Sequence, residues 1–478
     1  MLFNSIQFFL FFIIVYGLYL AFKHRWQNWL LIVASCLFYA AWNWKFLLLM
    51  FVSISTDFWC SNLIVRTSDL KKRRAWLWLS LGVNLGILGF FKYYNFFAGN
   101  VQGFLQTFHL VSPAFSLALN IVLPVGVSFY TFEAISYIVD VYHEKIKPAQ
   151  RYWDYVLFVI YFPHLIAGPI MRAKDFLPQI SLPRKIRLDQ FYDGCFLFFW
   201  GLLEKILIAD NLAKIADPIF SAVAPYDGGK VLIALYAFAF QIFCDFDGYS
   251  NMARGMGKCM GFEITINFKQ PYFSTNPQEF WQRWHISLSS WLRDYLYIPL
   301  GGNRKGKART YINLFLTMLL GGLWHGAAWT FVLWGAYQGV LLAIHRVVSP
   351  YFSNLGDNLS EFLKGLWKLA RIIFFFQFIC LGWLLFRATS LSQVGEMLTA
   401  LFNPVSWHFQ SDSFNLWMMI ITYISITVFV QFFQYQTNDQ TAALKWPWQA
   451  RAAFYILCYF LVIFYGVEGG KQFIYFQF

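Results

Sequence analysis

Two histidines lie in segments whose composition suggests chemistry. His325 lies between two glycines, Gly322 and Gly326, in an apolar stretch, and His285 follows a segment rich in tryptophan. A neutral imidazole, with a reference pKa of about 6.5, can accept a proton from a hydroxyl group at physiological pH. Ionisable side chains inside apolar segments are usually functional, so we predict that His325 transfers a proton and that the glycines leave room for a substrate. The alternative for both histidines is a buried side chain that is hydrogen-bonded to a backbone carbonyl.

Two carboxylates, Asp245 and Asp247, interrupt another apolar segment. A charged side chain at the centre of a bilayer costs about 2.5–3.5 kcal/mol on insertion scales, so neither residue should face lipid. Residues two apart point to different faces of a helix, which argues against a pair that shares one proton. We predict structural ion pairs with Lys or Arg for these aspartates, and a structural polar role for His164.

Familiar catalytic and cofactor motifs are missing from the sequence. It has no Gly-x-Ser-x-Gly, no His-Glu-x-x-His and no phosphate-binding loop. The spacing of Gly255, Gly257 and Gly261 does not fit a dinucleotide-binding turn, and we interpret these glycines as sites of close helix packing. The seven cysteines are scattered without a Cys-x-x-Cys pair, so we expect no disulfides and no metal site.

The elements that must position these residues are membrane helices. Of 478 residues, 59% are hydrophobic and only 13% are charged, against about 25% charged residues in soluble domains. A membrane helix needs roughly 20 mainly apolar residues, and we predict an all-α polytopic integral membrane protein with about ten to thirteen transmembrane or re-entrant helices. The clearest predicted spans are residues 8–22, 46–65, 75–91, 231–243, 327–344, 372–386, 416–433 and 453–467.

The net charge of +13 comes from basic residues in short loops between apolar stretches. This pattern indicates orientation in the membrane and contact with anionic lipids rather than binding to nucleic acid. Lys23, His24 and Arg25 follow the first apolar stretch without a cleavage site, which favours a retained first helix. No polar stretch is long enough for a second core, so we expect one domain over residues 1–478.

Two segments do not fit simple membrane helices. Residues 156–170 contain Pro163 and Pro169 and lie between basic loops, so we predict that this segment enters the membrane and returns to the same side. Residues 261–303 are too charged to face lipid and too aromatic for a free loop, and we predict short amphipathic or re-entrant helices. Irregular backbone at membrane depth is tolerated where it is buried or lines a cavity, which usually marks a site.

Several long motifs resemble the membrane-bound O-acyltransferase family, and its bacterial branch of alginate O-acetylation membrane proteins in particular. The resemblance runs nearly from end to end. The two histidine signatures and the supporting matches are residues 280–289, 291–298, 300–304, 321–327, 123–130, 162–169 and 475–478.

The resemblance implies helices around a central tunnel, with His325 at the family's catalytic position and His285 at its second signature position. It also implies an acyl group that moves from a cytoplasmic thioester towards an extracytoplasmic acceptor. Substrate binding or positioning is then expected from the polar and aromatic side chains of the signatures. These are Arg283, Trp284, Arg293, Asp294, Asn303 and Trp324.

The function that we predict is O-acylation of a cell-envelope polysaccharide such as alginate, peptidoglycan or cellulose. Acetyl-CoA or another acyl thioester would be the donor substrate, with no bound cofactor. The expected location is the cytoplasmic (inner) membrane, with a separate extracytoplasmic esterase-like partner that completes the transfer. A transporter with a His/Asp proton relay is the alternative, and a scaffold without chemistry is a third reading.

Overall fold

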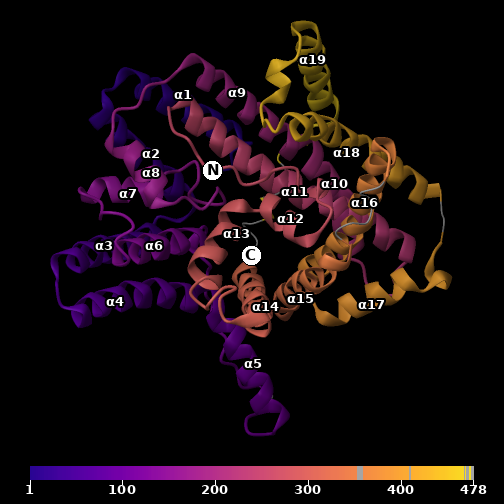
Figure 1. Ribbon diagram of the computed structural model, residues 1–478, viewed down its shortest axis with the longest axis horizontal. Coiled ribbons are helices and arrows are strands. Elements are labelled where there is room, and N and C mark those ends of the chain that lie inside the picture. The colour runs from indigo at the N-terminus through magenta and orange to yellow at the C-terminus, as the bar shows by residue number, and fades with distance from the viewer. Residues whose placement is uncertain (113, 353–358, 409–410, 468, 470–472, 475–478) are drawn as a thin grey trace. The chain divides into compact units, whose positions relative to one another are not determined.

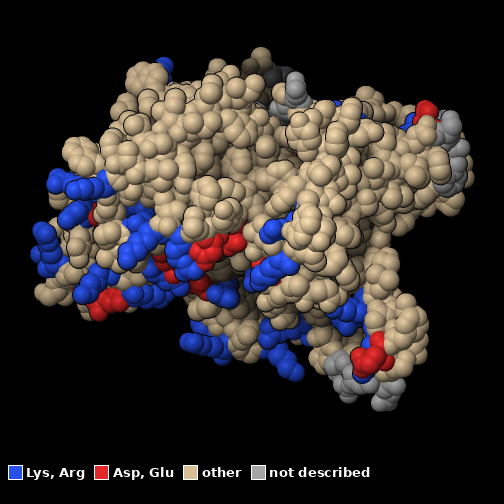
Figure 2. All heavy atoms as spheres, turned by 90° about the horizontal axis from the view of Figure 1, so that it is seen from above, with Lys and Arg blue, Asp and Glu red and all other residues tan. Residues whose placement is uncertain are grey.

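The computed structural model describes residues 1–478 except 113, 353–358, 409–410, 468, 470–472 and 475–478 (Figure 1). The described residues form helices joined by turns and loops, with no strand among them. This confirms the predicted all-helical membrane architecture. In Figure 2, wide areas of the visible surface carry neither Lys, Arg, Asp nor Glu, as expected for a protein that contacts lipid.

The described part of the chain forms two compact units. The first unit comprises Met1–Phe191 with Met256–Thr265, and the second comprises Tyr192–Gly255 with Ile266–Gln477. Both candidate histidines belong to the second unit. A single domain over residues 1–478 remains a prediction.

The first unit is built from helices of different lengths, of which Lys45–Arg66 and the continuous stretch Leu70–Thr107 are long and apolar enough to cross a membrane. Its helices are α1 (Ile6–Ala21), α2 (His24–Asn43), α3 (Lys45–Arg66), α4 (Leu70–Leu88), α5 (Tyr94–Thr107), α6 (Val127–Tyr142), α7 (Tyr152–Ile160) and α8 (Ala173–Ser181), with a π-helical turn at Gly89–Tyr93. Side chains cap two of these helices, since the Ser5 hydroxyl and the Asp69 carboxylate accept hydrogen bonds from Phe8 N and Lys71 N.

The second unit combines long helices with short ones. Its α-helices are α9 (Leu188–Leu203), α10 (Asp210–Phe220), α11 (Gly228–Cys259), α12 (Pro277–Arg283), α13 (Ile286–Leu292), α14 (Gly306–His325), α15 (Trp329–Phe352), α16 (Glu361–Arg387), α17 (Leu391–Phe402), α18 (Ser411–Thr437) and α19 (Trp448–Tyr465). Its π-helical turns are Glu204–Ala209 (η2) and Arg293–Tyr297 (η4), and its 3₁₀ turns are Pro271–Phe273 (η3), Pro404–Ser406 (η5) and Ala442–Lys445 (η6).

Every predicted span lies in helical structure, apart from a few terminal residues. Seven helical stretches in the described residues are long and apolar enough to cross a membrane, and α1 is a shorter apolar helix. α11 is buried along most of its length, so it lies in the interior of the fold, where its aspartates can find partners. The expected ten to thirteen spans and the central tunnel remain predictions.

Both segments that interrupt the predicted pattern are short or irregular. α7 has only nine residues, and the chain from Tyr161 to Met171 then runs without a helix while remaining almost completely inaccessible to solvent. The later segment consists of η3, α12, α13 and η4, as predicted for short amphipathic helices. The same-side orientation of the loops around residues 156–170 remains a prediction.

Candidate active site

His325 is the last residue of α14, and the glycines beside it set how closely α14 and α15 pack. A Cβ atom on Gly322 would lie 2.3 Å from the Phe331 carbonyl oxygen and 2.8 Å from Gly335 Cα. A Cβ atom on Gly326 would lie 2.1 Å from the Phe331 ring. The expectation that these glycines leave room for a substrate was wrong, because Phe331 and the Gly335 backbone fill that space. The glycines instead allow α15 to hold the end of α14.

The His325 ring lies in an aromatic environment. Trp334 and Phe386 present their rings edge-on to it, with centroids 5.0 and 5.4 Å from the imidazole centroid. His325 is 4% exposed and Trp334 is 1% exposed. Such an environment excludes water and strengthens any electrostatic interaction with a reacting group.

His285 adopts a left-handed backbone conformation at the start of α13, with φ 43° and ψ 55°. This conformation is uncommon for a residue other than glycine and costs of order 1–3 kcal/mol, so the surrounding contacts must hold it. Asn267 provides one of them, since His285 Nδ1 lies 3.1 Å from Asn267 Oδ1. Ser287 holds Asn267 in turn, because the N–H and the hydroxyl of Ser287 both donate to Asn267 Oδ1, at 3.2 and 2.9 Å.

These contacts define the tautomer of His285. The Ser287 backbone N–H can only donate, so the Asn267 atom that it contacts is the amide oxygen. His285 Nδ1 must therefore carry the proton in this contact, and Nε2 carries the lone pair of the neutral ring. Burial lowers the pKa of His285, so the ring is neutral at physiological pH.

The two predicted histidines lie together in the second unit. Their ring centroids are 6.4 Å apart, with the ring planes at 63°. The Trp324 ring contacts both imidazoles, with ring centroids 6.2 Å apart for His285 and 5.0 Å apart for His325. Phe246 of α11 packs edge-on against His285 at 4.7 Å. The aromatic cluster therefore holds two imidazoles from separate segments at one place.

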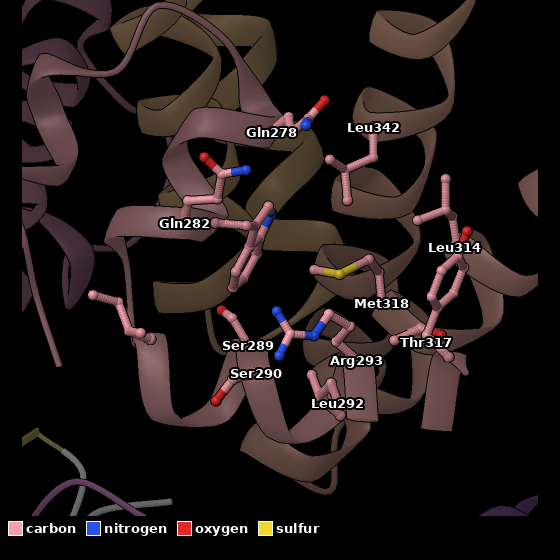
Figure 3. Close-up of a pocket in the computed structure, with 13 residues that line it drawn as sticks. Gln278, Gln282, Ser289, Ser290, Leu292, Arg293, Leu314, Thr317, Met318 and Leu342 are labelled. Atoms are coloured by element: carbon pink, nitrogen blue, oxygen red, sulfur yellow. The ribbon is translucent and has the colours of Figure 1, made fainter. Parts of the chain in front are cut away.

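A cavity of about 380 Å³ lies between α12, α13, η4, α14 and α15 (Figure 3). Gln278, Gln282 and Ser289 give it a polar side, while Met318 and Leu342 belong to its apolar side. Its lining also includes Ile286, the residue directly after His285. Trp281 lines the cavity too, and its buried indole N–H has no hydrogen-bond partner within the described part of the chain. The cavity therefore combines apolar surface with a few polar groups, as small-molecule sites do.

The sequence signals that start α12 are local. The Asn276 side chain accepts a hydrogen bond from Glu279 N at 2.9 Å, and Pro277 follows at the first helical position. Glu279 returns the interaction by accepting from Thr275 N at 2.9 Å. This reciprocal cap fixes the helix that presents Trp281 and Gln282 to the cavity.

The other predicted positioning residues have different surroundings. Arg283 forms an ion pair with Glu279 at 3.1 Å, and Trp284 is buried against Trp383 at 4.8 Å. Arg293 lines the cavity and pairs with its neighbour Asp294 at 2.8 Å. Asn303, in the exposed turn before α14, accepts hydrogen bonds from Tyr297 and Arg346. Of these residues, Arg293 reaches the cavity and Trp324 contacts both histidines.

Asp245 and Asp247 have separate partners. Lys205 Nζ lies 2.7 Å from Asp245 and 2.8 Å from Asp210, and all three side chains are buried. The second oxygen of Asp245 accepts the Ile474 N–H at 2.7 Å, which ties a C-terminal residue to α11. Asp247 has Arg254 and the Glu204 carboxylate as charged neighbours and Asn251 as a polar one. The ion pair with Lys205 supports a structural role for Asp245, and the structural role of Asp247 remains a prediction.

His164 belongs to the first unit and lies in the buried irregular segment after α7. Its Nδ1 atom is 3.4 Å from a Glu133 carboxylate oxygen, and that oxygen also accepts the Met171 N–H at 2.8 Å. The contact joins α6 to the irregular segment, which supports the structural polar role proposed for His164. Among the residues that the structure describes, no group of three or more His, Cys, Asp or Glu side chains is arranged to hold a metal ion.

Comparison with known proteins identifies the family. The model of the membrane-bound O-acyltransferase family matches residues 150–388. A probable alginate O-acetylase of Pseudomonas putida is 43% identical over 440 residues, which cover 90% of this chain and 87% of the relative. The chain belongs to the membrane-bound O-acyltransferase family. It is therefore a membrane enzyme that transfers an acyl group, and it requires an acyl donor.

Two further relatives of this O-acyltransferase act on different polymers, according to their names. A peptidoglycan O-acetyltransferase of Helicobacter pylori is 36% identical, over 77% of this chain and 72% of the relative. A teichoic acid D-alanyltransferase of Bacillus subtilis is 27% identical, over 56% of this chain and 69% of the relative. The family match covers His285, His325 and the whole lining of the cavity.

Sequence reasoning missed several residues of this acyltransferase site. Asn267 entered the sequence analysis only as part of the segment 261–303, and Trp334 only as part of a predicted span. Lys205 follows Glu204 inside an apolar stretch, which is a signal of buried charge, but the sequence does not show that Asp245 is its partner. For Trp334 the sequence carries no comparable signal.

Proposed function

We propose that this O-acyltransferase moves an acetyl group from acetyl-CoA towards O-acetylation of a cell-envelope polysaccharide, at the cytoplasmic (inner) membrane. The observation that carries the proposal is the pairing of His285 and His325 in one buried aromatic cluster beside a cavity. The names of the Pseudomonas putida and Helicobacter pylori relatives support acetyl as the group and an envelope polymer as the final acceptor.

In this proposal His325 is the general base. The oxygen of an acceptor hydroxyl attacks the thioester carbonyl carbon, and the imidazole takes the hydroxyl proton as the new C–O bond forms. The tetrahedral intermediate then collapses, the C–S bond breaks, and the proton passes to the leaving sulfur. A positioned base of this kind is worth about 10²–10⁴-fold in rate.

His285 is a positioning residue in the same step. Its Nδ1–H is engaged by Asn267, so its Nε2 atom can accept a hydrogen bond but cannot donate one in the neutral form. It therefore suits a role in orienting a hydroxyl group, and it does not suit the polarisation of a carbonyl oxygen. Because the low pKa of His285 keeps the ring neutral, the lone pair is present throughout the physiological pH range.

The cavity suits the thioester arm of the donor. Such an arm is a chain of methylene groups interrupted by amides, which matches the mixed lining of Gln278, Gln282, Met318 and Leu342. The buried Trp281 N–H can donate to an amide carbonyl of the arm, and a volume of about 380 Å³ falls within the usual range of ligand sites.

A separate extracytoplasmic esterase-like protein would complete the transfer to the polysaccharide. The family membership and the names of the relatives argue against the transporter alternative.

Reconstituted vesicles test the proposal. Labelled acetyl should move from acetyl-CoA on one side to an acceptor on the other, and the transfer should require His325. Solute uptake without acetyl transfer would replace the proposal with the transporter reading.

A further inference from the structure

The second unit contains a second cavity, and none of its lining residues lines the cavity next to the histidines. It has a volume of about 670 Å³ and lies between the last turns of α15 and the first half of α16, with Thr275 and Asn276 beside it. We call it the α15–α16 groove. The residues that define it are His345, Val348, Phe352, Trp367, Arg371 and Phe374.

The walls of the groove are apolar and open to the surroundings of the protein. Phe352 and Phe374 are 58% and 66% exposed, and Val348 and Trp367 are each 38% exposed. Both α15 and α16 belong to the helices that are long and apolar enough to span a membrane. Exposed apolar side chains on such helices contact acyl chains, and tryptophan is enriched where the apolar core meets the headgroups.

The groove also contains the guanidinium of Arg371. Arg371 Nη2 donates to the Thr275 hydroxyl at 3.1 Å, and no carboxylate among the described residues forms an ion pair with Arg371. Lys368 lies one turn earlier on α16, with its ammonium 4.7 Å from the centre of the Tyr435 ring. By contrast, Lys364 is already paired with Glu361 at 2.9 Å. A planar guanidinium at this position matches the geometry of a phosphate.

From these observations we infer that the α15–α16 groove binds an anionic phospholipid. Its phosphate contacts Arg371, and its acyl chains lie along Val348, Phe352 and Phe374. A water-soluble nucleotide would leave these exposed apolar walls uncovered, whereas a phospholipid satisfies the cation and the walls together. This inference does not depend on the acetyl group or on the acceptor of the proposed function.

Residues of the groove are also connected to elements of the active site. Thr275, the partner of Arg371, takes part in the reciprocal cap of α12 through Glu279. His345 is one helical turn from Leu342, which lines the cavity of about 380 Å³ next to the histidines. The structure therefore connects Arg371, through Thr275, to the start of the helix that presents Trp281 to the cavity.

Lipid retention tests the inference directly. The full-length protein is purified from nanodiscs that contain equal amounts of phosphatidylglycerol and phosphatidylcholine, and retained lipid is counted by native mass spectrometry. We expect preferential retention of phosphatidylglycerol, reduced about fivefold or more in Arg371→Gln and unchanged in the control Lys364→Gln. Equal retention of the two lipids, or equal retention by both variants, would overturn the inference.

A second variant provides a test if Arg371→Gln does not fold, and a competitor tests whether a nucleotide binds in the groove instead of a lipid. Val348→Trp fills the groove without removing charge, so it should also lose phosphatidylglycerol even if Arg371→Gln does not fold. Coenzyme A added in excess should leave the retained phosphatidylglycerol unchanged. Displacement of the lipid by coenzyme A would assign the groove to a nucleotide and refute the lipid site, while leaving the role of His325 intact.

Discussion

Asn267 Oδ1 lies 3.1 Å from His285 Nδ1 and also accepts the Ser287 N–H, so a single amide oxygen sets both the position and the tautomer of the histidine. The two residues are 18 positions apart in the sequence, and the left-handed backbone at His285 brings its ring to this oxygen. The arrangement makes Asn267 a positioning residue for the proposed transfer.

Removal of this oxygen should slow the reaction more than it weakens substrate binding. We expect Asn267→Ala to lower kcat for acetyl transfer about 10–100-fold, because loss of a group that orients a functional histidine has typically cost this much in metal sites. Asn267→Asp keeps an acceptor oxygen and should retain more of kcat than Asn267→Ala. Steady-state kinetics of the two purified variants give the comparison, and equal values for both would show that the oxygen does not orient His285.

Loss of the Asp245 carboxylate should reduce stability more than turnover. Asp245→Asn removes one carboxylate partner of the buried Lys205, and breaking a buried ion pair costs up to about 3–5 kcal/mol. We expect a lower Tm in detergent and nearly normal turnover per folded molecule. Asp189→Asn, which removes an exposed partner of Arg187, is the matched control and should leave the Tm unchanged. Normal stability of Asp245→Asn with lost turnover would instead place Asp245 in the reaction.

The close packing of α14 on α15 predicts a steric effect at Gly322. Gly322→Ala places a Cβ atom 2.3 Å from the Phe331 carbonyl oxygen. α14 must therefore move away from α15 at Gly322, which is one helical turn before His325. Overpacking of this kind typically costs about 1–3 kcal/mol, and we expect a lower Tm together with reduced acetyl transfer. Gly365→Ala in α16 meets no atom within 4 Å and should be harmless. Wild-type activity and Tm in Gly322→Ala would show that the helices can separate without consequence for His325.

The low pKa of His285 predicts an acid-sensitive contribution to stability. The folded state keeps this imidazole neutral, whereas the unfolded chain binds a proton below a pKa of about 6.5. The contribution is therefore fully present above pH 6.5 and is lost as the pH falls below it. The drop in Tm from pH 7.5 to pH 5.5 should be smaller in His285→Gln than in the parent protein. An identical drop in both proteins would contradict the neutral assignment.

The long helices could be predicted because length and hydropathy are properties of a local window. α1 and α3 therefore agree with the predicted spans to within two residues at each end, whereas α15 extends eight residues beyond its predicted span and α16 begins eleven residues before its own. The short elements between Pro271 and Tyr297 were also predictable, since charge and tryptophan at helical spacing exclude both a lipid-facing span and a free loop.

The partners of the buried polar groups could not be predicted, because they come from distant parts of the chain. Lys205 is 40 residues from Asp245, and only the folded structure shows that η2 places its ammonium between Asp210 and Asp245. The role of Gly322 was misjudged for a related reason. A glycine marks a place without a side chain, and the sequence does not show whether a substrate or a neighbouring helix occupies the space.

Acetyl transfer by a folded His325 variant is the most direct test of the central claim. We measure labelled acetyl transferred from acetyl-CoA in reconstituted vesicles that contain the parent protein, His325→Ala or His285→Ala. His408→Ala, in an exposed loop, is the matched control. The account predicts normal transfer in His408→Ala, partial loss in His285→Ala, and no detectable transfer in His325→Ala at near-normal expression and Tm. Full transfer by folded His325→Ala protein would contradict the account.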